Sequence, residues 1–104
     1  MTTFDDRERA FENKFAHDEE MKFRAEALRN KLLALWAADL LGKTGDDALA
    51  YAGDVTRVAV GKAGDDDIVH KVSTDLGDQS SDAEVRQKLD DMLLVAKGKI
   101  LEEF

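Results

Sequence analysis

The sequence predicts an all-α protein: a four-helix bundle that follows a mobile N-terminal arm. Two observations lead to this fold class. Proline is absent from the 104 residues, so no position forbids a helix. Four segments repeat apolar residues at intervals of three and four, and glycines or capping residues separate these segments. The length fits one domain, and we expect residues 1–18 to form the arm and residues 19–104 the bundle.

The first predicted helix covers residues 18–41 and has the clearest periodicity. Gly42 follows it directly, at the place where a left-handed C-cap is expected. The spacing predicts an inward face made of Met21, Ala25, Leu28, Leu32, Leu35 or Trp36, and Leu40.

The end of this helix also matches a relaxed nucleotide-binding motif. Residues 37–44, AADLLGKT, satisfy the pattern [AG]-x-x-x-x-G-K-[ST]. A P-loop needs a buried strand before it and a glycine-rich turn whose amides surround phosphate. The residues before Gly42 are instead strong helix formers without a second glycine. We therefore interpret Gly42, Lys43 and Thr44 as the junction between two helices.

The second helix is predicted over residues 45–60, with Gly61 after its end. Residues 55–60, VTRVAV, are rich in β-branched side chains and would also suit a strand. No partner strand is predicted elsewhere, and an isolated strand leaves its backbone groups unpaired, so we expect a helix. Its inward residues should be Ala48, Ala52, Val55 and Ala59.

The third helix is predicted to begin at Asp65–Asp66–Asp67 and to end before Gly77. Three aspartates could suggest a cation site, but they lack the alternating ligands and the distant glutamate of a calcium loop. Carboxylates are favourable at the positive end of a helix dipole, so we interpret them as an acidic first turn. We expect His70 to be partly buried beside the apolar face. That face is Ile68, Val69, Val72 and Leu76.

The last helix is predicted to begin at the capping box Ser81–Asp82–Ala83–Glu84 and to continue to about residue 101. Gly98 lies inside this helix and weakens it by about 1 kcal/mol relative to alanine. The expected inward residues are Val85, Leu89, Met92 or Leu93, Ala96 and Ile100.

Charge and composition restrict the classes of partner and site. The 23 acidic and 15 basic residues give a net charge of -8, which argues against binding to nucleic acid or anionic membranes. There is no cysteine, and two isolated histidines do not suggest a metal site. No serine or threonine has a plausible base nearby, so we expect no catalytic residues and no enzyme activity. Without a signal peptide or a long apolar segment, we expect a cytoplasmic protein that does not insert into a membrane.

The arm has a different pattern from the rest of the chain. Apart from Met1, its large apolar residues are Phe4, Phe11 and Phe15, which share one stripe of a helix. The stripe is too narrow for firm docking on the bundle, and the segment is too short for a lasting helix in water. This pattern is typical of a segment that folds on a partner, with aromatic anchors and charges that set the register. The alternative, that Phe11 and Phe15 extend the first helix and cover the end of the bundle, stays open.

Residues 4–42, FDDRERAFENKFAHDEEMKFRAEALRNKLLALWAADLLG, resemble the start of the ζ subunit of α-proteobacterial F-type ATP synthases, a small inhibitor of ATP hydrolysis. The matching positions include the FDDRE opening, KFAHDEE, Phe23 and RNKLL, and a looser likeness extends through most of the chain. The resemblance implies a four-helix bundle with an inhibitory arm. In that family the arm folds into a helix inside a catalytic α/β interface of the synthase head and meets the central rotor.

The expected site is therefore a protein-binding arm. The expected partners are the catalytic α and β subunits and the central rotor of the synthase, which would keep the protein peripheral to the inner membrane. No cofactor is expected. Two alternatives stay open: a helical regulatory protein that binds an adenine nucleotide weakly, and a family member with weak or no inhibition. The candidate partner-binding residues are Phe4, Arg7, Glu8, Arg9, Phe11, Glu12, Lys14 and Phe15.

Overall fold

The computed structural model describes residues 19–59 and 64–102, and within these ranges it contains helices and no strand. The prediction of an all-α four-helix bundle is confirmed, and the helix ends agree with the sequence prediction to within one or two residues. The elements are α2 (Glu19–Leu40), α3 (Gly45–Ala59), α4 (Asp65–Leu76), the short 3-10 helix η1 (Gly77–Gln79) and α5 (Asp82–Glu102).

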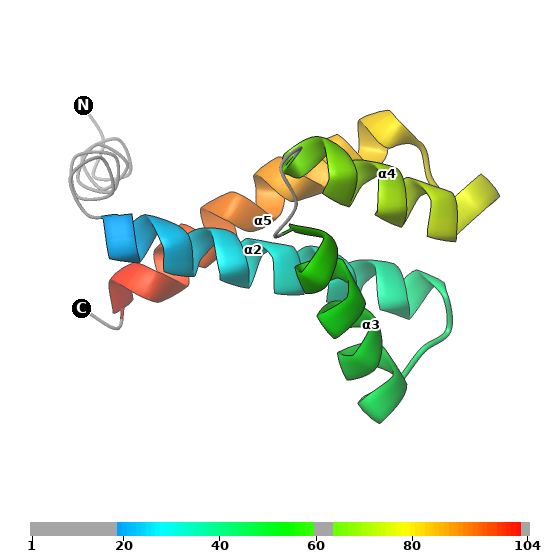
Figure 1. The fold of residues 1–104 in the computed structure, drawn as a ribbon, viewed down its shortest axis with the longest axis horizontal. Helices are drawn as coiled ribbons and strands as arrows, with labels where there is room; N and C mark the ends of the chain where they lie inside the picture. Colours follow the sequence, from blue (N-terminus) through cyan, green and yellow to red (C-terminus); the bar gives the residue numbers. More distant parts are fainter. Residues whose placement is uncertain (1–18, 60–63, 103–104) are drawn as a thin grey trace.

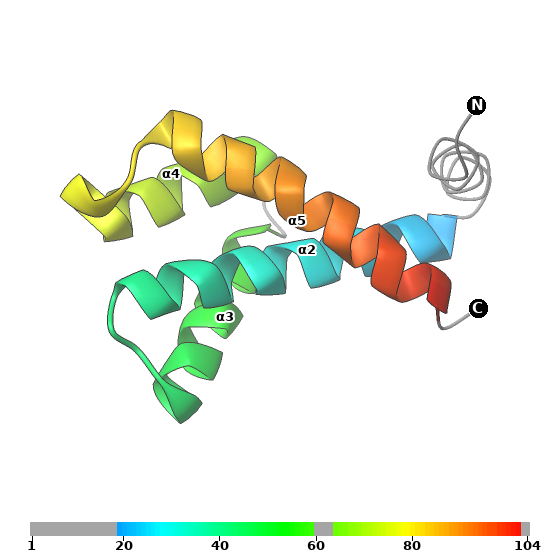
Figure 2. The same cartoon turned by 180° about the vertical axis from the view of Figure 1, so that it is seen from behind.

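The helices α2 and α5 lie antiparallel along the long axis of the molecule (Figure 1). Both α3 and α4 pack at the end where α2 finishes, as the view from behind also shows (Figure 2). At the opposite end only α2 and α5 lie together among the described helices. We call residues 19–28 with residues 97–102 the two-helix end, and the remainder of the described bundle the four-helix end.

Apart from Ala96, the buried apolar side chains form two separate clusters. The smaller one lies at the two-helix end and consists of Met21, Ala25 and Ile100, with Leu28 and Leu101 partly buried against it. The larger one lies at the four-helix end and takes residues from all four α-helices. Its members are Leu33, Ala34, Ala37, Ala38, Tyr51, Ala52, Val55, Ile68, Val69, Val72, Leu76, Val85 and Leu89.

The predicted inward face of α2 is only partly right. Met21 and Ala25 are buried as expected, but Leu40 is exposed, and the polar Arg29 and Asn30 are buried instead. The physical reason is that α2 packs against α3, α4 and α5, so its buried surface is wider than one stripe. Four buried apolar residues of α2 were missing from the prediction: Leu33, Ala34, Ala37 and Ala38.

The inward faces of the other helices largely follow the prediction, because each of these helices buries one stripe. In α4 the whole predicted set is buried, whereas the prediction for His70 was wrong because its side chain is exposed. His70 follows the buried Val69 by one residue, and one residue turns a helix by about 100°, which carries the imidazole out of the core. Residues 55–59 are helical, so the alternative of a strand there is excluded for this part of α3.

Glycine and serine end or begin the helices at the predicted places. Gly42 and Gly77 have positive φ angles of 74° and 55°, which glycine adopts without a steric penalty. At the start of α5, the Oγ of Ser81 accepts a hydrogen bond from the backbone N–H of Glu84 at 3.2 Å. The carboxylate of Glu84 accepts a second bond from the hydroxyl of Ser80 at 2.9 Å. Ser81 thus caps α5 as expected from the capping box.

Candidate functional site

The predicted partner-binding residues all lie outside the described residues, so their roles stay predictions. The nearest of them, Phe15, is four residues before Glu19, where α2 begins. Four residues of chain span at most about 14 Å. A partner that holds Phe15 must therefore lie close to the two-helix end of the bundle. The surface of that end is the described surface closest along the chain to the predicted contacts.

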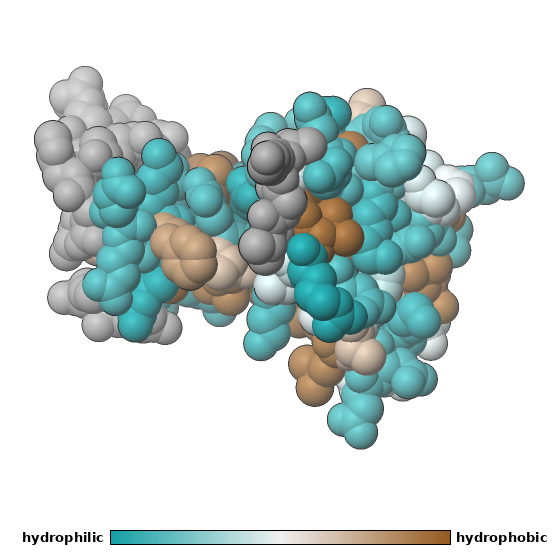
Figure 3. All heavy atoms as spheres, viewed as in Figure 1, coloured by the Kyte–Doolittle hydropathy of each residue, from teal (hydrophilic) through white to brown (hydrophobic). Residues whose placement is uncertain are grey.

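The two-helix end exposes a large aromatic side chain. Phe23 is 72% exposed, more than any other large hydrophobic residue among those described. Ala27, one helical turn further on, is exposed too, and an apolar patch is visible over the first half of α2 (Figure 3). Phe23 is not among the contact residues predicted from the sequence. Its position in the helical repeat could have indicated the exposure. Phe23 is two residues from both Met21 and Ala25, so it faces the opposite side of the helix.

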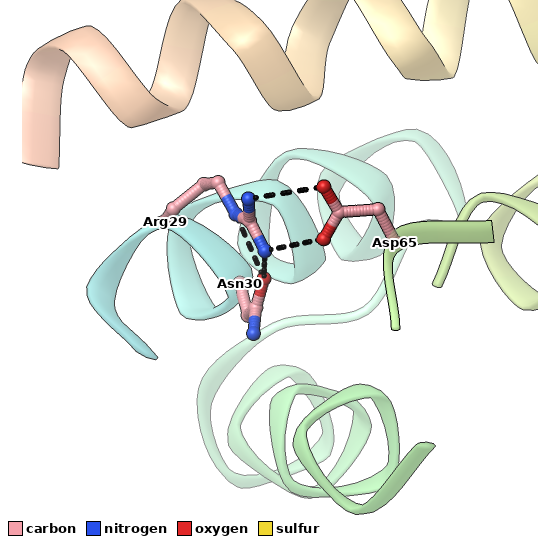
Figure 4. Close-up of polar contacts among 3 residues, drawn as sticks. All are labelled: Arg29, Asn30 and Asp65. Carbon is pink, nitrogen blue, oxygen red and sulfur yellow. Dashed lines mark hydrogen bonds and ion pairs between the residues drawn. The ribbon is translucent and has the colours of Figure 1, made fainter. Parts of the chain in front are cut away.

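A partly buried ionic cluster joins α2 to α4 where the two ends of the bundle meet (Figure 4). The Nη1 and Nη2 atoms of Arg29 donate to the carboxylate of Asp65 at 3.4 and 2.9 Å. Nε and Nη2 also donate to Oδ1 of Asn30, at 3.0 and 2.9 Å. The side chain of Arg29 is 8% exposed and that of Asp65 is 57% exposed. Removing the carboxylate would leave a buried guanidinium short of acceptors, so the pair holds the first residue of α4 against α2.

A second ion pair joins the same turn of α4 to α5. Nη2 of Arg86 donates to the carboxylate of Asp66 at 3.0 Å, and both side chains are exposed. Two of the three aspartates at the start of α4 therefore have arginine partners on neighbouring helices. This arrangement supports the interpretation of the aspartates as a structural first turn.

The sequence between α2 and α3 is a helix junction and not a phosphate loop. The backbone N–H of Lys43 donates to the carbonyl of Ala38 at 2.9 Å, and the carbonyl of Thr44 accepts from Asp47 at 3.1 Å. These backbone groups are used to end one helix and to begin the next. The P-loop interpretation is therefore excluded, as the strong helix formers before Gly42 had indicated.

A shallow cavity of about 320 Å³ lies beside this junction. Asp75 accepts hydrogen bonds from the hydroxyl of Tyr51 and from Nζ of Lys71, both at 3.0 Å. Burial raises the pKa of the Tyr51 hydroxyl well above its usual value, and the bond to Asp75 raises it further. Two lysines and two aspartates balance one another around the cavity, so it offers no excess positive charge to a polyphosphate. The lining residues are Leu41, Lys43, Tyr51, Asp54, Lys71 and Asp75.

Residues 19–59 and 64–102 contain no group of three or more histidine, cysteine, aspartate or glutamate side chains that could hold a metal ion. Within the same part of the chain, no helix combines the length and the apolar character needed to cross a membrane.

The chain is similar to known proteins in both fold and sequence. One protein, solved by solution NMR, superimposes with a TM-score of 0.73 and 45% sequence identity, over 81% of this chain and 99% of that chain. No curated protein is significantly similar in sequence. The family model of the ATPase inhibitor subunit zeta matches residues 1–99, which include the arm as well as most of the bundle. The chain therefore belongs to the ATPase inhibitor subunit zeta family.

Proposed function

We propose that this protein is a regulatory subunit that inhibits ATP hydrolysis by an F-type ATP synthase, with its arm inserted as a helix into a catalytic α/β interface. The observation that carries the proposal is the family match, which starts at residue 1 and so covers the arm together with the bundle. Burial of Phe4, Phe11 and Phe15 would contribute about 1.5–3 kcal/mol each, less the cost of ordering the arm. Arg7, Arg9, Lys14 and the neighbouring acids would set its register. A helix wedged beside the central rotor would block rotation in the hydrolytic direction.

The bundle has a supporting role in this proposal. It presents the arm from the start of α2, and the Arg29–Asp65 pair together with the larger core cluster holds α2 in place. The bundle is also too bulky to follow a single helix into a groove. It would therefore limit how far the arm enters and would add contact area at the mouth of the groove.

The proposal is tested by titrating the full-length protein and a variant that lacks residues 1–18 into a cognate synthase head while ATP hydrolysis is followed. We expect the truncated variant to lose inhibition while it keeps a helical circular dichroism spectrum and a cooperative melting transition. A full-length variant with alanine at Phe4, Phe11 and Phe15 serves as a control for chain length and should lose inhibition as well. If all three proteins inhibit equally, the arm is not the inhibitory element.

The same proteins also test the two alternative functions. A family member with weak inhibition would show a shallow titration even with the arm intact. Adenine-nucleotide binding would appear in a calorimetric titration with ADP and would survive removal of the arm. The balanced charges around Lys43 and Asp75 lend that alternative no support.

A further inference from the structure

The packing of the two-helix end leaves Phe23 without a place in the core. Met21 and Ala25 pack with Ile100 of α5 and so fix the rotation of α2 about its axis. In this rotation the ring of Phe23 faces solvent on the opposite side of the helix. A phenylalanine gains about 1.5–3 kcal/mol when it is fully buried, and Phe23 gains little of that from its own bundle.

The surroundings of Phe23 have the composition of a protein-binding surface. We define the α2 patch as Phe23 and Ala27, two exposed residues one turn apart on α2. The small side chain of Ala27 leaves space beside the ring for an incoming surface. Charged residues flank the patch, and Glu20 pairs with Arg24 at 3.8 Å on its border. Protein interfaces usually have aromatic residues at the centre and charged or polar residues at the rim.

The patch is too small to bind a partner by itself. A stable interface buries about 800 Å² on each side, several times the area of one ring and one methyl group. This argues against a second copy of the chain held by the patch alone. The patch can contribute only where a larger interface is already present beside it.

We propose that the α2 patch is a second contact with the synthase head that receives the arm, with Phe23 in an apolar pocket just outside the groove. This inference rests on the proposed function, and the observation behind it is continuity along the chain. Phe15 and Phe23 are eight residues apart, at most about 28 Å of chain. A head that holds Phe15 therefore lies within reach of the patch. The arm anchors the protein, and the patch orients the bundle against the head.

The first test is the substitution Phe23→Ala in the full chain, with the arm unchanged. We expect the concentration needed for half-inhibition of ATP hydrolysis to rise on the order of ten- to hundredfold, as for loss of a buried aromatic anchor. The melting temperature should not change, because the ring is exposed in the free protein. Leu94→Ala is the matched control, since Leu94 is 63% exposed on α5 and should not affect inhibition.

A second test reads the position of the patch directly. The chain has no cysteine, so Phe23→Cys creates a single site for an environment-sensitive dye. We expect its emission to shift to shorter wavelength when the synthase head is added, while a dye on Leu94→Cys stays unchanged. A shift that follows the protein's own concentration without the head would overturn the inference and would identify a second copy as the occupant.

The outcomes separate the two levels of the proposal. If alanine at Phe11 and Phe15 weakens inhibition while Phe23→Ala does not, and the dye at position 23 stays in water, the patch inference is wrong and the inhibitory arm stands. If the arm variants inhibit as well as the unchanged protein, the proposed function is wrong and the patch inference with it.

Discussion

The two ends of the bundle are held together in different ways. The four-helix end buries one continuous cluster with side chains from all four α-helices. The two-helix end depends on Met21, Ala25 and Ile100. Between them, Arg29 and Asn30 occupy inward positions of α2 and interrupt the apolar core. Most of the packing that stabilises the fold therefore lies away from residue 19, where α2 begins. The end beside the proposed partner can therefore change its contacts without loss of the fold.

The largest expected effect is at the four-helix end. Leu33 is fully buried in the larger cluster, so Leu33→Ala should reduce the free energy of unfolding by about 2–5 kcal/mol. Denaturant titration followed by circular dichroism measures this loss. Leu49→Ala is the control, because Leu49 is exposed on α3 and its removal should cost less than about 0.5 kcal/mol. A loss at Leu33 as small as that at Leu49 would contradict the placement of the core.

Ile100→Ala should have a smaller and more local effect. The side chain is buried in the smaller cluster, near the helix end, where the remaining residues can close around the gap, so we expect about 2 kcal/mol, the lower end of the range for such changes. Native-state hydrogen exchange should show faster exchange at residues 21–28 and 97–102 with little change at residues 33–38. Equal acceleration in both regions would show that the two clusters unfold as one unit.

The ionic cluster between the two ends gives the next effect. Asp65→Asn would leave Arg29 without its charged partner, and we expect a loss of about 1 kcal/mol, since Asp65 is itself half exposed. Part of this loss of stability should disappear at high salt, because salt screens the ion pair that the unchanged protein contains. Asp66→Asn is the matched control at the next position, because the pair of Asp66 with Arg86 is exposed and should contribute almost nothing. If both variants lose the same stability, the burial of Arg29 has no special importance.

Tyr51 should make the stability of the four-helix end sensitive to alkaline pH. Its pKa lies above the usual value of 10.0, first because of burial and then because of Asp75. The folded protein therefore holds the phenolic proton more tightly than the unfolded chain. The contribution of Tyr51 to the free energy of unfolding is complete below pH 10, and it decreases as the pH rises further because the unfolded chain then loses the proton first. Tyr51→Phe should cost about 1 kcal/mol at neutral pH and should flatten this alkaline decrease. Melting temperatures of both proteins, measured from neutral pH to above pH 10, follow this decrease. Parallel curves would contradict the role of Tyr51 in it.

The smallest expected effect is a gain in helix stability at the two-helix end. Apart from its chain neighbours and the nearby backbone of its own helix, a Cβ atom added at Gly98 would meet no atom within 4 Å. Alanine is favoured over glycine inside a helix by about 0.5–1 kcal/mol. Gly98→Ala should therefore slow hydrogen exchange at residues 97–102 without changing it at residues 33–38. A loss of stability in this variant would contradict the space for a methyl group at Gly98.

Local sequence signals were sufficient for most of the fold. The glycine at position 42, the capping Ser81 and the single apolar stripe of α4 each act within a few residues, so they could be predicted without tertiary information. The same signals correctly separated the GKT junction from a P-loop.

Features that depend on tertiary packing could not be predicted in this way. The central position of α2 widened its buried face, and the partner of Arg29 lies 36 residues away in the sequence. No periodicity connects two such residues. The exposure of Phe23 is different, because the predicted burial of Met21 and Ala25 already placed Phe23 on the opposite side of the helix. The candidate residues of the arm lie outside the described residues, so their roles remain predictions that only binding experiments can test.

Hydrogen exchange on the full-length protein, with and without a cognate synthase head, tests the central claim most directly. The claim is that the two-helix end faces the head and the four-helix end does not. We expect binding to slow exchange at residues 19–28 while α3 and α4 keep the rates of the free protein. Slower exchange in α3 and α4, with no change at residues 19–28, would contradict the account.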